Sequence, residues 1–152
     1  MDRNAACDVY LFDASMRYMS IVEHGYTVEQ RVAGIPAPPA GVGFDLFLEG
    51  RVTGQRVNGT FTGVNYVRLG PEGTALVHVH AHITTHDGCH IAVHCEGTSR
   101  RRVSSSIADV LGTMSFATAA DGYRWINSVA GITRGVSNLE ARTGEFAVVE
   151  RR

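Results

Sequence analysis

The amino-acid sequence predicts an all-β protein that folds as a single domain, either a sandwich or a barrel. Its 152 residues fit one domain of ordinary size. Short runs rich in β-branched and aromatic residues alternate with glycine-containing turns, which is typical of antiparallel all-β folds. With 44% apolar and 19% charged residues, the composition is that of a globular chain. We therefore expect residues 1–152 to form one β domain.

Five runs are the clearest candidate strands. Each has the length of a strand, is rich in β-prone residues, and is bordered by glycine or by another turn-forming residue. In chain order these strands are expected at 44–50, 59–69, 75–85, 89–97 and 144–150.

Two other segments have a different character. Residues 34–43 hold three of the four prolines and are expected to form a loop that covers one end of the fold. Residues 104–114 are expected to form the one short helix, because a serine cap at Ser105 or Ser106 precedes apolar residues at helical spacing.

Charge and cysteine content exclude several classes of protein. The formal net charge of -1 implies no basic face, so nucleic acid is not an expected partner. Three cysteines without CxxC spacing argue against a disulfide framework and a zinc ribbon, and we expect reduced thiols. The N-terminus does not resemble a signal peptide, and no apolar run approaches the ~20 residues of a membrane helix. We expect a cytoplasmic protein with no membrane partner.

Two tight turns set the predicted strand register. The segments 70–74 and 85–89 each suit a type I turn followed by a left-handed glycine, which closes a hairpin with a bulge. This geometry places Phe61 opposite Ile83, and Ile83 opposite Ile91. Because opposite residues share a face, one face of the three strands becomes apolar. Its members on the last two strands are Val77, Val79, Ala81, Ile83, Ile91 and Val93.

The opposite face of these strands carries histidine. Six of the seven histidines lie within residues 78–94, and the five that fall on the two predicted strands all occupy even positions. Histidine is the commonest metal ligand, and an HxH pair with a third histidine across the sheet can fill three positions of a zinc or iron site. The trio would be His78, His80 and His94, with Glu96 as a carboxylate. The remaining members of the face are His82 and His90.

The alternative is that this face is simply the outside of a barrel. An apolar inner face turns the histidines outward, where they meet water or a partner subunit. The HxH pair also lacks the glutamate that follows it in cupin-type metal barrels. We therefore expect a site without metal or cofactor, and a homodimer that uses the outward face. A His-ligated metalloenzyme stays open as an alternative.

Asn65 is a polar residue on the predicted inner face. A buried amide must find hydrogen bonds or cost about 1–3 kcal/mol. The amide is either bonded to backbone or anchors a ligand inside the fold, for which the neighbouring Gly63 would leave room.

Residues 122–128 offer further polar groups. If the segment is extended, Tyr123, Trp125 and Asn127 share one face and form the floor of a ligand pocket with polar handles. No nucleophile elbow, phosphate loop or dinucleotide fingerprint is present in the sequence, so phosphoryl-transfer and hydride-transfer enzymes are not expected.

The order and spacing of several motifs resemble one family. They are GxxTGxxxxGTxxGVNYxRLxxxGxxxxHVHAxITTxDG, then I-A-V-x-x-x-G, a late Y-x-W-I-N and a terminal T-G-E. Over residues 42–150 the chain resembles domain-of-unknown-function family 3237, a family of small calycin-like, or lipocalin-type, β-barrels. The resemblance implies a closed or nearly closed antiparallel barrel with an internal cavity.

Two positions depart from the family pattern. The usual G-V-D-Y reads G-V-N-Y here, so Asn65 can donate and accept hydrogen bonds but cannot act as an acid or base. An acidic residue often precedes the turn aspartate in the family, whereas His86 precedes Asp87 in this chain.

The resemblance also implies a function, since some relatives look like cofactor-independent enzymes that close rings in natural-product pathways. We expect a small-molecule-binding barrel that acts as a cyclase or isomerase on a polyketide-like or other natural-product intermediate. A non-catalytic carrier with the same cavity is the second hypothesis. The expected catalytic residues are His80, His78 and Asn65. The expected substrate contacts are Tyr66, Tyr123, Trp125, Asn127 and His94.

Overall fold

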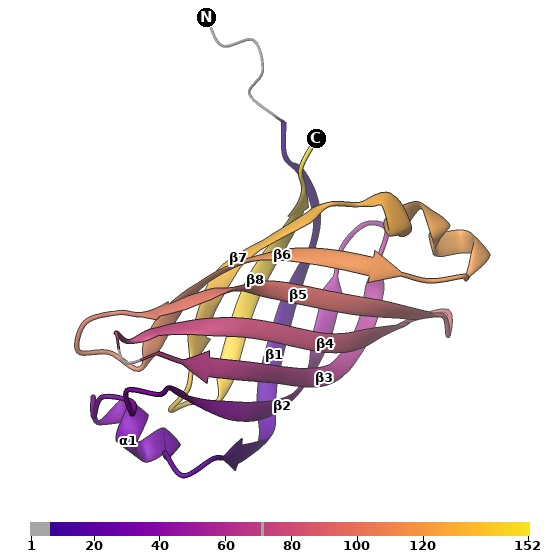
Figure 1. Cartoon of the computed structure of the whole chain (residues 1–152). Helices are drawn as coiled ribbons and strands as arrows, with labels where there is room; N and C mark the ends of the chain where they lie inside the picture. The colour runs from indigo at the N-terminus through magenta and orange to yellow at the C-terminus, as the bar shows by residue number, and fades with distance from the viewer. Residues whose placement is uncertain (1–6, 71) are drawn as a thin grey trace, which may run out of the picture.

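Eight strands close into one antiparallel barrel in the computed structural model of the chain (Figure 1). The structure describes residues 7–70 and 72–152. Each strand pairs with its neighbours in sequence, and β8 closes the barrel against β1. The all-β prediction is confirmed, and of its two forms the chain adopts the barrel. The strands are β1 (Val9–Glu23), β2 (Val42–Thr53), β3 (Asn58–Leu69), β4 (Thr74–Thr85), β5 (His90–Arg101), β6 (Ile107–Ala117), β7 (Gly131–Asn138) and β8 (Thr143–Glu150).

The predicted register of β3, β4 and β5 is confirmed. Phe61 pairs with Ile83, and Ile83 pairs with Ile91. Gly88 has a φ of 85°, the left-handed conformation that a bulged type I turn requires. The predicted apolar face of β4 and β5 therefore points into the barrel, and the histidines of these two strands point out.

The helix predicted at 104–114 is wrong, because this segment forms strand β6. The serine predicted as a helix cap closes a turn instead: the Oγ of Ser105 accepts the backbone N–H of Ile107 at 3.0 Å. The apolar residues of this segment also recur at every second position, and this period favours a strand over a helix. Every second residue of β6 faces the barrel interior, where its burial outweighs local helix propensity. The inward residues that line the interior or pack in its core are Ala108, Val110, Met114 and Phe116.

The segment 122–128 is also not extended. It belongs to a 3-10 helix, η1 (Asp121–Ser128), whose buried residues Tyr123 and Ile126 lie three positions apart. The single α-helix of the described residues is α1 (Val28–Val32), which is capped at its N-terminus by the side chain of Thr27.

The two ends of the barrel are closed by different segments (Figure 1). At one end, α1 and the proline-containing loop pack on an apolar cluster that includes Tyr26, Ala37 and Phe44, so the predicted covering loop is confirmed. At the other end, η1 packs on a second cluster through Tyr123 and Ile126. None of the helices described by the structure has the length and apolar character needed to cross a bilayer.

Candidate functional site

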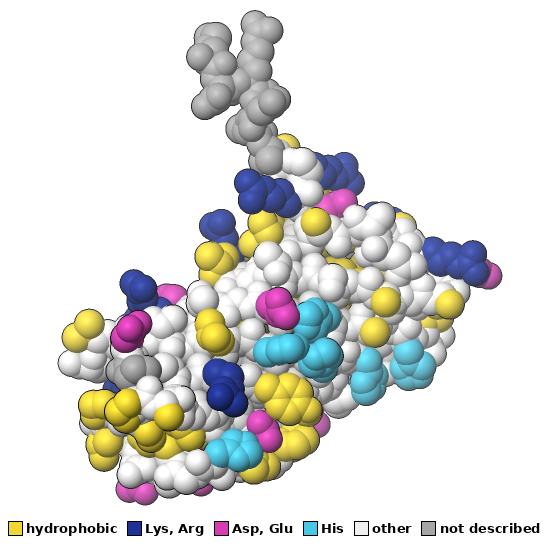
Figure 2. Space-filling view, viewed as in Figure 1, with side chains coloured by type: hydrophobic (Ala, Val, Ile, Leu, Met, Phe, Trp, Pro, Cys, Tyr) yellow, Lys and Arg dark blue, Asp and Glu magenta, His cyan; other side chains and the backbone are white. Residues whose placement is uncertain are grey.

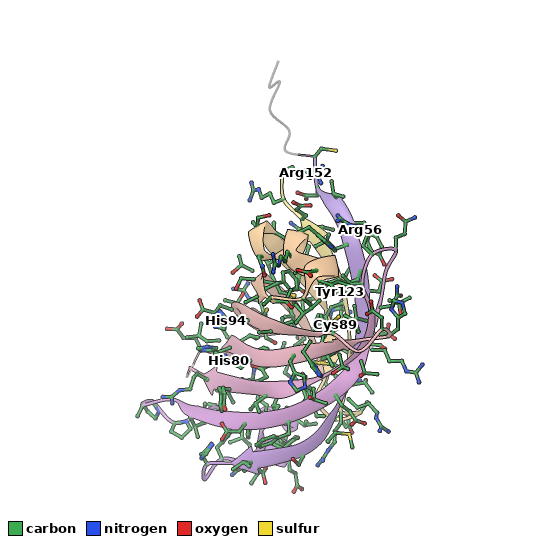
Figure 3. The ribbon with its side chains drawn as sticks, turned by 90° about the vertical axis from the view of Figure 1, so that its right-hand side faces the viewer. Arg56, His80, Cys89, His94, Tyr123 and Arg152 are labelled. Atoms are coloured by element: carbon green, nitrogen blue, oxygen red, sulfur yellow. The ribbon has the colours of Figure 1, made fainter. Side chains whose placement is uncertain are left out.

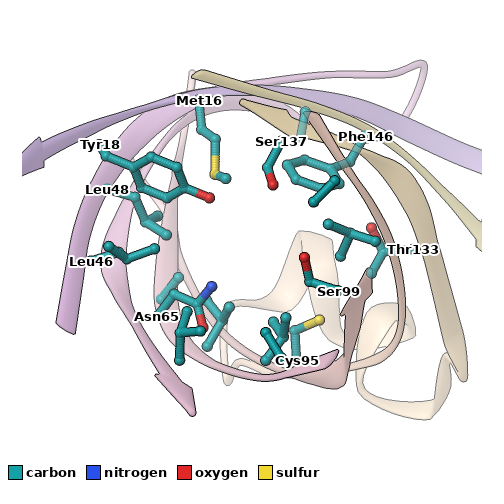
Figure 4. Close-up of a pocket in the computed structure, with 18 of the residues that line it drawn as sticks. Met16, Tyr18, Leu46, Leu48, Asn65, Cys95, Ser99, Thr133, Ser137 and Phe146 are labelled. Carbon is teal, nitrogen blue, oxygen red and sulfur yellow. The ribbon is translucent and has the colours of Figure 1, made fainter. Parts of the chain in front are cut away.

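A cavity of about 160 Å³ lies inside the barrel between the two apolar clusters (Figure 4). Its wall is mostly apolar, and its charged lining residues are Arg31 and Arg101. Among the described residues that line it, none is a carboxylate or a histidine. A cavity of roughly 150 Å³ accommodates a molecule of the size of benzene, so the space suits a compact ligand. The remaining polar lining residues are Tyr18, Asn65, Cys95, Ser99, Ser106, Thr133 and Ser137.

Asn65 lines this cavity and is only 6% exposed. Its Oδ1 accepts the backbone N–H of His78 at 3.1 Å. The β3–β4 pairing is interrupted at this point: Asn65 pairs with Val79, and the next pair is Arg68 with Leu76. The side-chain amide thus replaces part of the strand ladder. The hypothesis that the amide bonds to backbone is correct for its oxygen, and the amide nitrogen points into the cavity (Figure 4). Its role as a ligand anchor stays a prediction.

Gly63 does not enlarge the cavity, contrary to the prediction. A Cβ at this position would collide with the backbone carbonyl oxygen of His80 and with Ala81. Glycine is needed here because β3 and β4 approach closely, and the space that it leaves is taken up by the neighbouring strand.

Tyr18 is a second inward donor, and sequence reasoning missed it. Its hydroxyl points into the cavity from β1, and Ser137 from β7 lies within hydrogen-bonding reach (Figure 4). Burial raises the pKa of Tyr18 to about 12, so the phenol stays protonated and can donate. A signal was present: Phe12, Ala14, Met16 and Tyr18 alternate along β1, and all four line the cavity.

Cys95 contributes a neutral thiol to the wall. Burial is the main cause that raises its pKa to about 11, and the charge of Glu96 adds to the shift. Because the thiolate is the nucleophilic form, this shift lowers the reactivity of Cys95 at neutral pH. It behaves as an apolar wall residue.

Arg101 fastens α1 over one end of the cavity. Its guanidinium donates to the carbonyl oxygens of Arg31 and Val32 from α1 and of Ser105 from the turn before β6. Arg31 in turn donates to the carbonyl oxygen of Gly73 at 2.9 Å. The two bonds from Arg101 to α1 satisfy carbonyl groups at the C-terminal end of this very short helix, which has little intrinsic stability.

The histidines lie on the outer wall, away from the cavity. Figure 2 shows histidine side chains gathered on the face formed by β4 and β5, and Figure 3 places His80 and His94 on the outside of these strands. The cavity therefore cannot receive a proton from His78 or His80, and His94 cannot contact a ligand in it. Tyr66 is likewise on the outer surface, 45% exposed, with its ring edge against His80.

The aromatic and amide residues of η1 bind other parts of the protein. The Tyr123 hydroxyl donates to Asp87 Oδ1 at 2.7 Å, and the Arg56 guanidinium stacks on Trp125, 3.4 Å from the ring centre. Asn127 exchanges two hydrogen bonds with the backbone of Thr118. These groups hold η1 against the barrel, and none of them is in the cavity wall. Figure 3 shows Tyr123 and Arg56 at the end of the barrel that η1 covers.

Asp87 connects the β4–β5 turn to η1. Its Oδ1 accepts from the hydroxyls of Thr85 and Tyr123, and these two hydrogen bonds lower the pKa of the carboxyl below its ordinary value. The interpretation of Asp87 as a turn residue is consistent with these contacts. Its carboxylate also orients the helix that closes this end.

The fold and cavity define the chain as a closed antiparallel β-barrel with a small, mostly apolar interior site. Residues 22–150 match the family described as protein of unknown function (DUF3237), and the chain belongs to that family. The search of curated proteins gave no match.

Solved structures share the whole fold at low sequence identity. A β-barrel-like protein from Acinetobacter baumannii AYE is 15% identical, with a TM-score of 0.81 and 99% of both chains covered. A protein of unknown function from Clostridium acetobutylicum is 13% identical, with a TM-score of 0.76 and coverage of 96% of this chain and 99% of that one. A protein described as an enzyme from Penicillium herquei is 20% identical, with a TM-score of 0.66 and 99% of both chains covered.

Proposed function

We propose that the barrel binds a compact, largely apolar small molecule and promotes its cyclisation or isomerisation without a cofactor. The observation that carries this proposal is the cavity itself. Its apolar wall presents two neutral donors, the Asn65 amide nitrogen and the Tyr18 hydroxyl, from different strands. This combination suits a ligand with one hydrogen-bond acceptor, such as a ketone, on an apolar ring.

The same groups explain how such a site accelerates a reaction. Donors aimed at a carbonyl oxygen stabilise the negative charge that develops there as the carbonyl is polarised, and they act more strongly where water is excluded. The shape of the cavity holds a flexible intermediate in a folded conformation, which lowers the entropic cost of ring closure. The relative described as an enzyme is consistent with this proposal. The reaction would use a natural-product intermediate as its substrate.

A non-catalytic carrier is the second candidate, and one observation favours it. The described cavity wall contains no carboxylate or imidazole, the usual side chains that accept a proton near neutral pH. A reaction inside the barrel must therefore proceed by polarisation, with any base supplied by the substrate or by water.

Binding and turnover tests separate the two candidates. A panel of one-ring aryl ketones is titrated by calorimetry against the wild type, Tyr18→Phe and Ala108→Leu, which fills the cavity, with His82→Ala on the outer wall as the matched control. We expect Ala108→Leu to abolish binding, Tyr18→Phe to weaken it by about tenfold, and His82→Ala to leave it unchanged. Equal binding by all four proteins would refute the cavity as the site.

Catalysis is assayed with natural-product intermediates that cyclise slowly in buffer. Faster ring closure or a changed stereochemical outcome with the wild type, diminished in Tyr18→Phe, supports the enzyme. Binding without any change in rate or stereochemistry identifies the carrier.

A further inference from the structure

We propose that His78, His80 and His94 on the outer wall of the barrel form a binding site for a divalent transition metal, specifically Zn²⁺. The site lies on the opposite face of β4 and β5 from the cavity, so the proposal is independent of the proposed function. Its basis is the convergence of three imidazole nitrogens on one point.

The distances match a metal site. His78 Nε2 lies 2.9 Å from His80 Nε2 and 3.0 Å from His94 Nε2, and the three ligand atoms all lie within 4.8 Å of one another. Zn–N bonds of about 2.0–2.1 Å in a tetrahedron place neighbouring nitrogens about 3.3 Å apart. The spread of up to 4.8 Å must contract towards this value, and rotation of these solvent-accessible side chains allows the contraction. Within residues 7–70 and 72–152, no other three His, Cys, Asp or Glu side chains converge in this way.

The strand geometry makes this convergence specific. His78 and His80 are two residues apart on β4 and therefore share a face, and His80 pairs directly with His94 on β5. The bulged turn at 85–89 fixes this register. A slip of one residue would turn His94 into the barrel and destroy the trio.

Hydrogen bonding among the three rings does not account for the arrangement. A neutral imidazole nitrogen either donates one hydrogen or offers one lone pair, whereas His78 Nε2 faces two other Nε2 atoms. A divalent cation removes the conflict, because each neutral imidazole then directs its lone pair at the ion.

The donor set limits the metal to ions that prefer imidazole ligands. Three imidazoles suit zinc, copper or nickel and do not suit magnesium or calcium, which take oxygen ligands. Glu96 Oε1 lies 3.6 Å from His94 Nε2, close enough to serve as a fourth ligand or to hold a metal-bound water. Three histidines with a fourth position open to water are the donor set of catalytic zinc sites. The side chains of His94 and Glu96 are exposed, so that position is accessible to solvent.

The test uses the full chain without a histidine tag, in a Cys7→Ser background, because Cys7 is an exposed free thiol that could bind zinc by itself. Zn²⁺ is titrated in competition with a chelating dye, and bound metal is counted by elemental analysis. We expect one zinc per chain, and at least a tenfold loss of affinity in each of His78→Ala, His80→Ala and His94→Ala. The matched control is His82→Ala, a histidine on the same strand and face but outside the trio.

Co²⁺ substitution gives a readout that adventitious surface binding does not reproduce. A four-coordinate site is expected to show intense visible absorption bands, which Glu96→Gln shifts and the trio variants abolish. Circular dichroism of each variant establishes that it is folded, and variants on two different strands keep the test decisive if one of them unfolds.

Four results would overturn the proposal. The first three are zinc binding that survives all three alanine variants, equal losses in the His82→Ala control, and the absence of stoichiometric zinc. Half a zinc per chain accompanied by dimerisation in sedimentation analysis would also overturn it, because the site would then be completed by a second copy.

Discussion

Removal of the Asn65 side chain tests the hydrogen bond that replaces part of the β3–β4 ladder. Asn65 Oδ1 accepts the backbone N–H of His78 where the β3–β4 ladder is interrupted. In Asn65→Ala this N–H loses its partner, and an unsatisfied buried donor costs about 1–3 kcal/mol. We expect the free energy of unfolding to fall by that amount with an unchanged denaturant slope. Guanidinium titration measures it.

Hydrogen exchange gives the residue-specific readout for the same variant. The His78 amide is expected to exchange much faster in Asn65→Ala than in the wild type, whereas the amides of Ile83 and Ile91, in the confirmed register, keep their protection. Asn65→Asp is the matched control, because it retains an oxygen acceptor for the His78 N–H. It should preserve the protection while removing the donor that faces the cavity.

The reasoning fails if Asn65→Ala changes neither the free energy of unfolding nor the exchange rate of the His78 amide. Slow exchange at His78, together with a change in unfolding free energy below about 0.5 kcal/mol, would mean that the amide does not support the strand pairing. A loss of protection in Asn65→Asp equal to that in Asn65→Ala would refute the assignment of the bond to Oδ1.

Three further predictions follow from individual contacts. The pKa of Tyr18 is raised to about 12. The contribution of the Tyr18 hydroxyl to stability is therefore complete below its ordinary pKa of about 10 and is lost as the pH rises towards 12. Tyrosinate absorbance and the free energy of unfolding at alkaline pH measure this loss. Arg101→Ala removes the bonds to α1 and should speed both proteolysis near that helix and ligand entry, with an unchanged barrel circular dichroism spectrum. The pKa of Asp87 is lowered, so its contribution is present above the ordinary carboxyl pKa and is lost on acidification. Tyr123→Phe removes one cause of that shift and should lower the melting temperature by a few degrees at neutral pH and by less in acid.

Local sequence patterns predicted the structure correctly where one physical cause dominates. The two-residue alternation on β4 and β5 and the bulged turn at Gly88 predicted the register, and the burial of apolar side chains enforces it. The proline-rich loop was also predicted as an end cover. These features depend on contacts between neighbours in sequence or between strands joined by a short turn.

Two segments were assigned wrongly because the sequence supports two periodicities. The serines and apolar residues at 104–114 match a helix, yet pairing with β5 and β7 makes the segment a strand. Residues 122–128 match a strand, yet Tyr123 and Ile126 are buried together in a 3-10 helix. In both cases packing against distant parts of the chain outweighs local propensity.

The sequence by itself determined the all-β class, the hairpin register and the separation of histidines from apolar residues on β4 and β5. Only the tertiary structure decided what these faces surround. Closure of β8 on β1 turns the apolar face inward and brings Tyr18 of β1 to the same cavity as Asn65 of β3. It also leaves the histidines outside, with three of their nitrogens converging. The shared cavity depends on contacts between strands far apart in the chain, which no short sequence pattern encodes, whereas the histidine trio lies on two strands joined by a short turn.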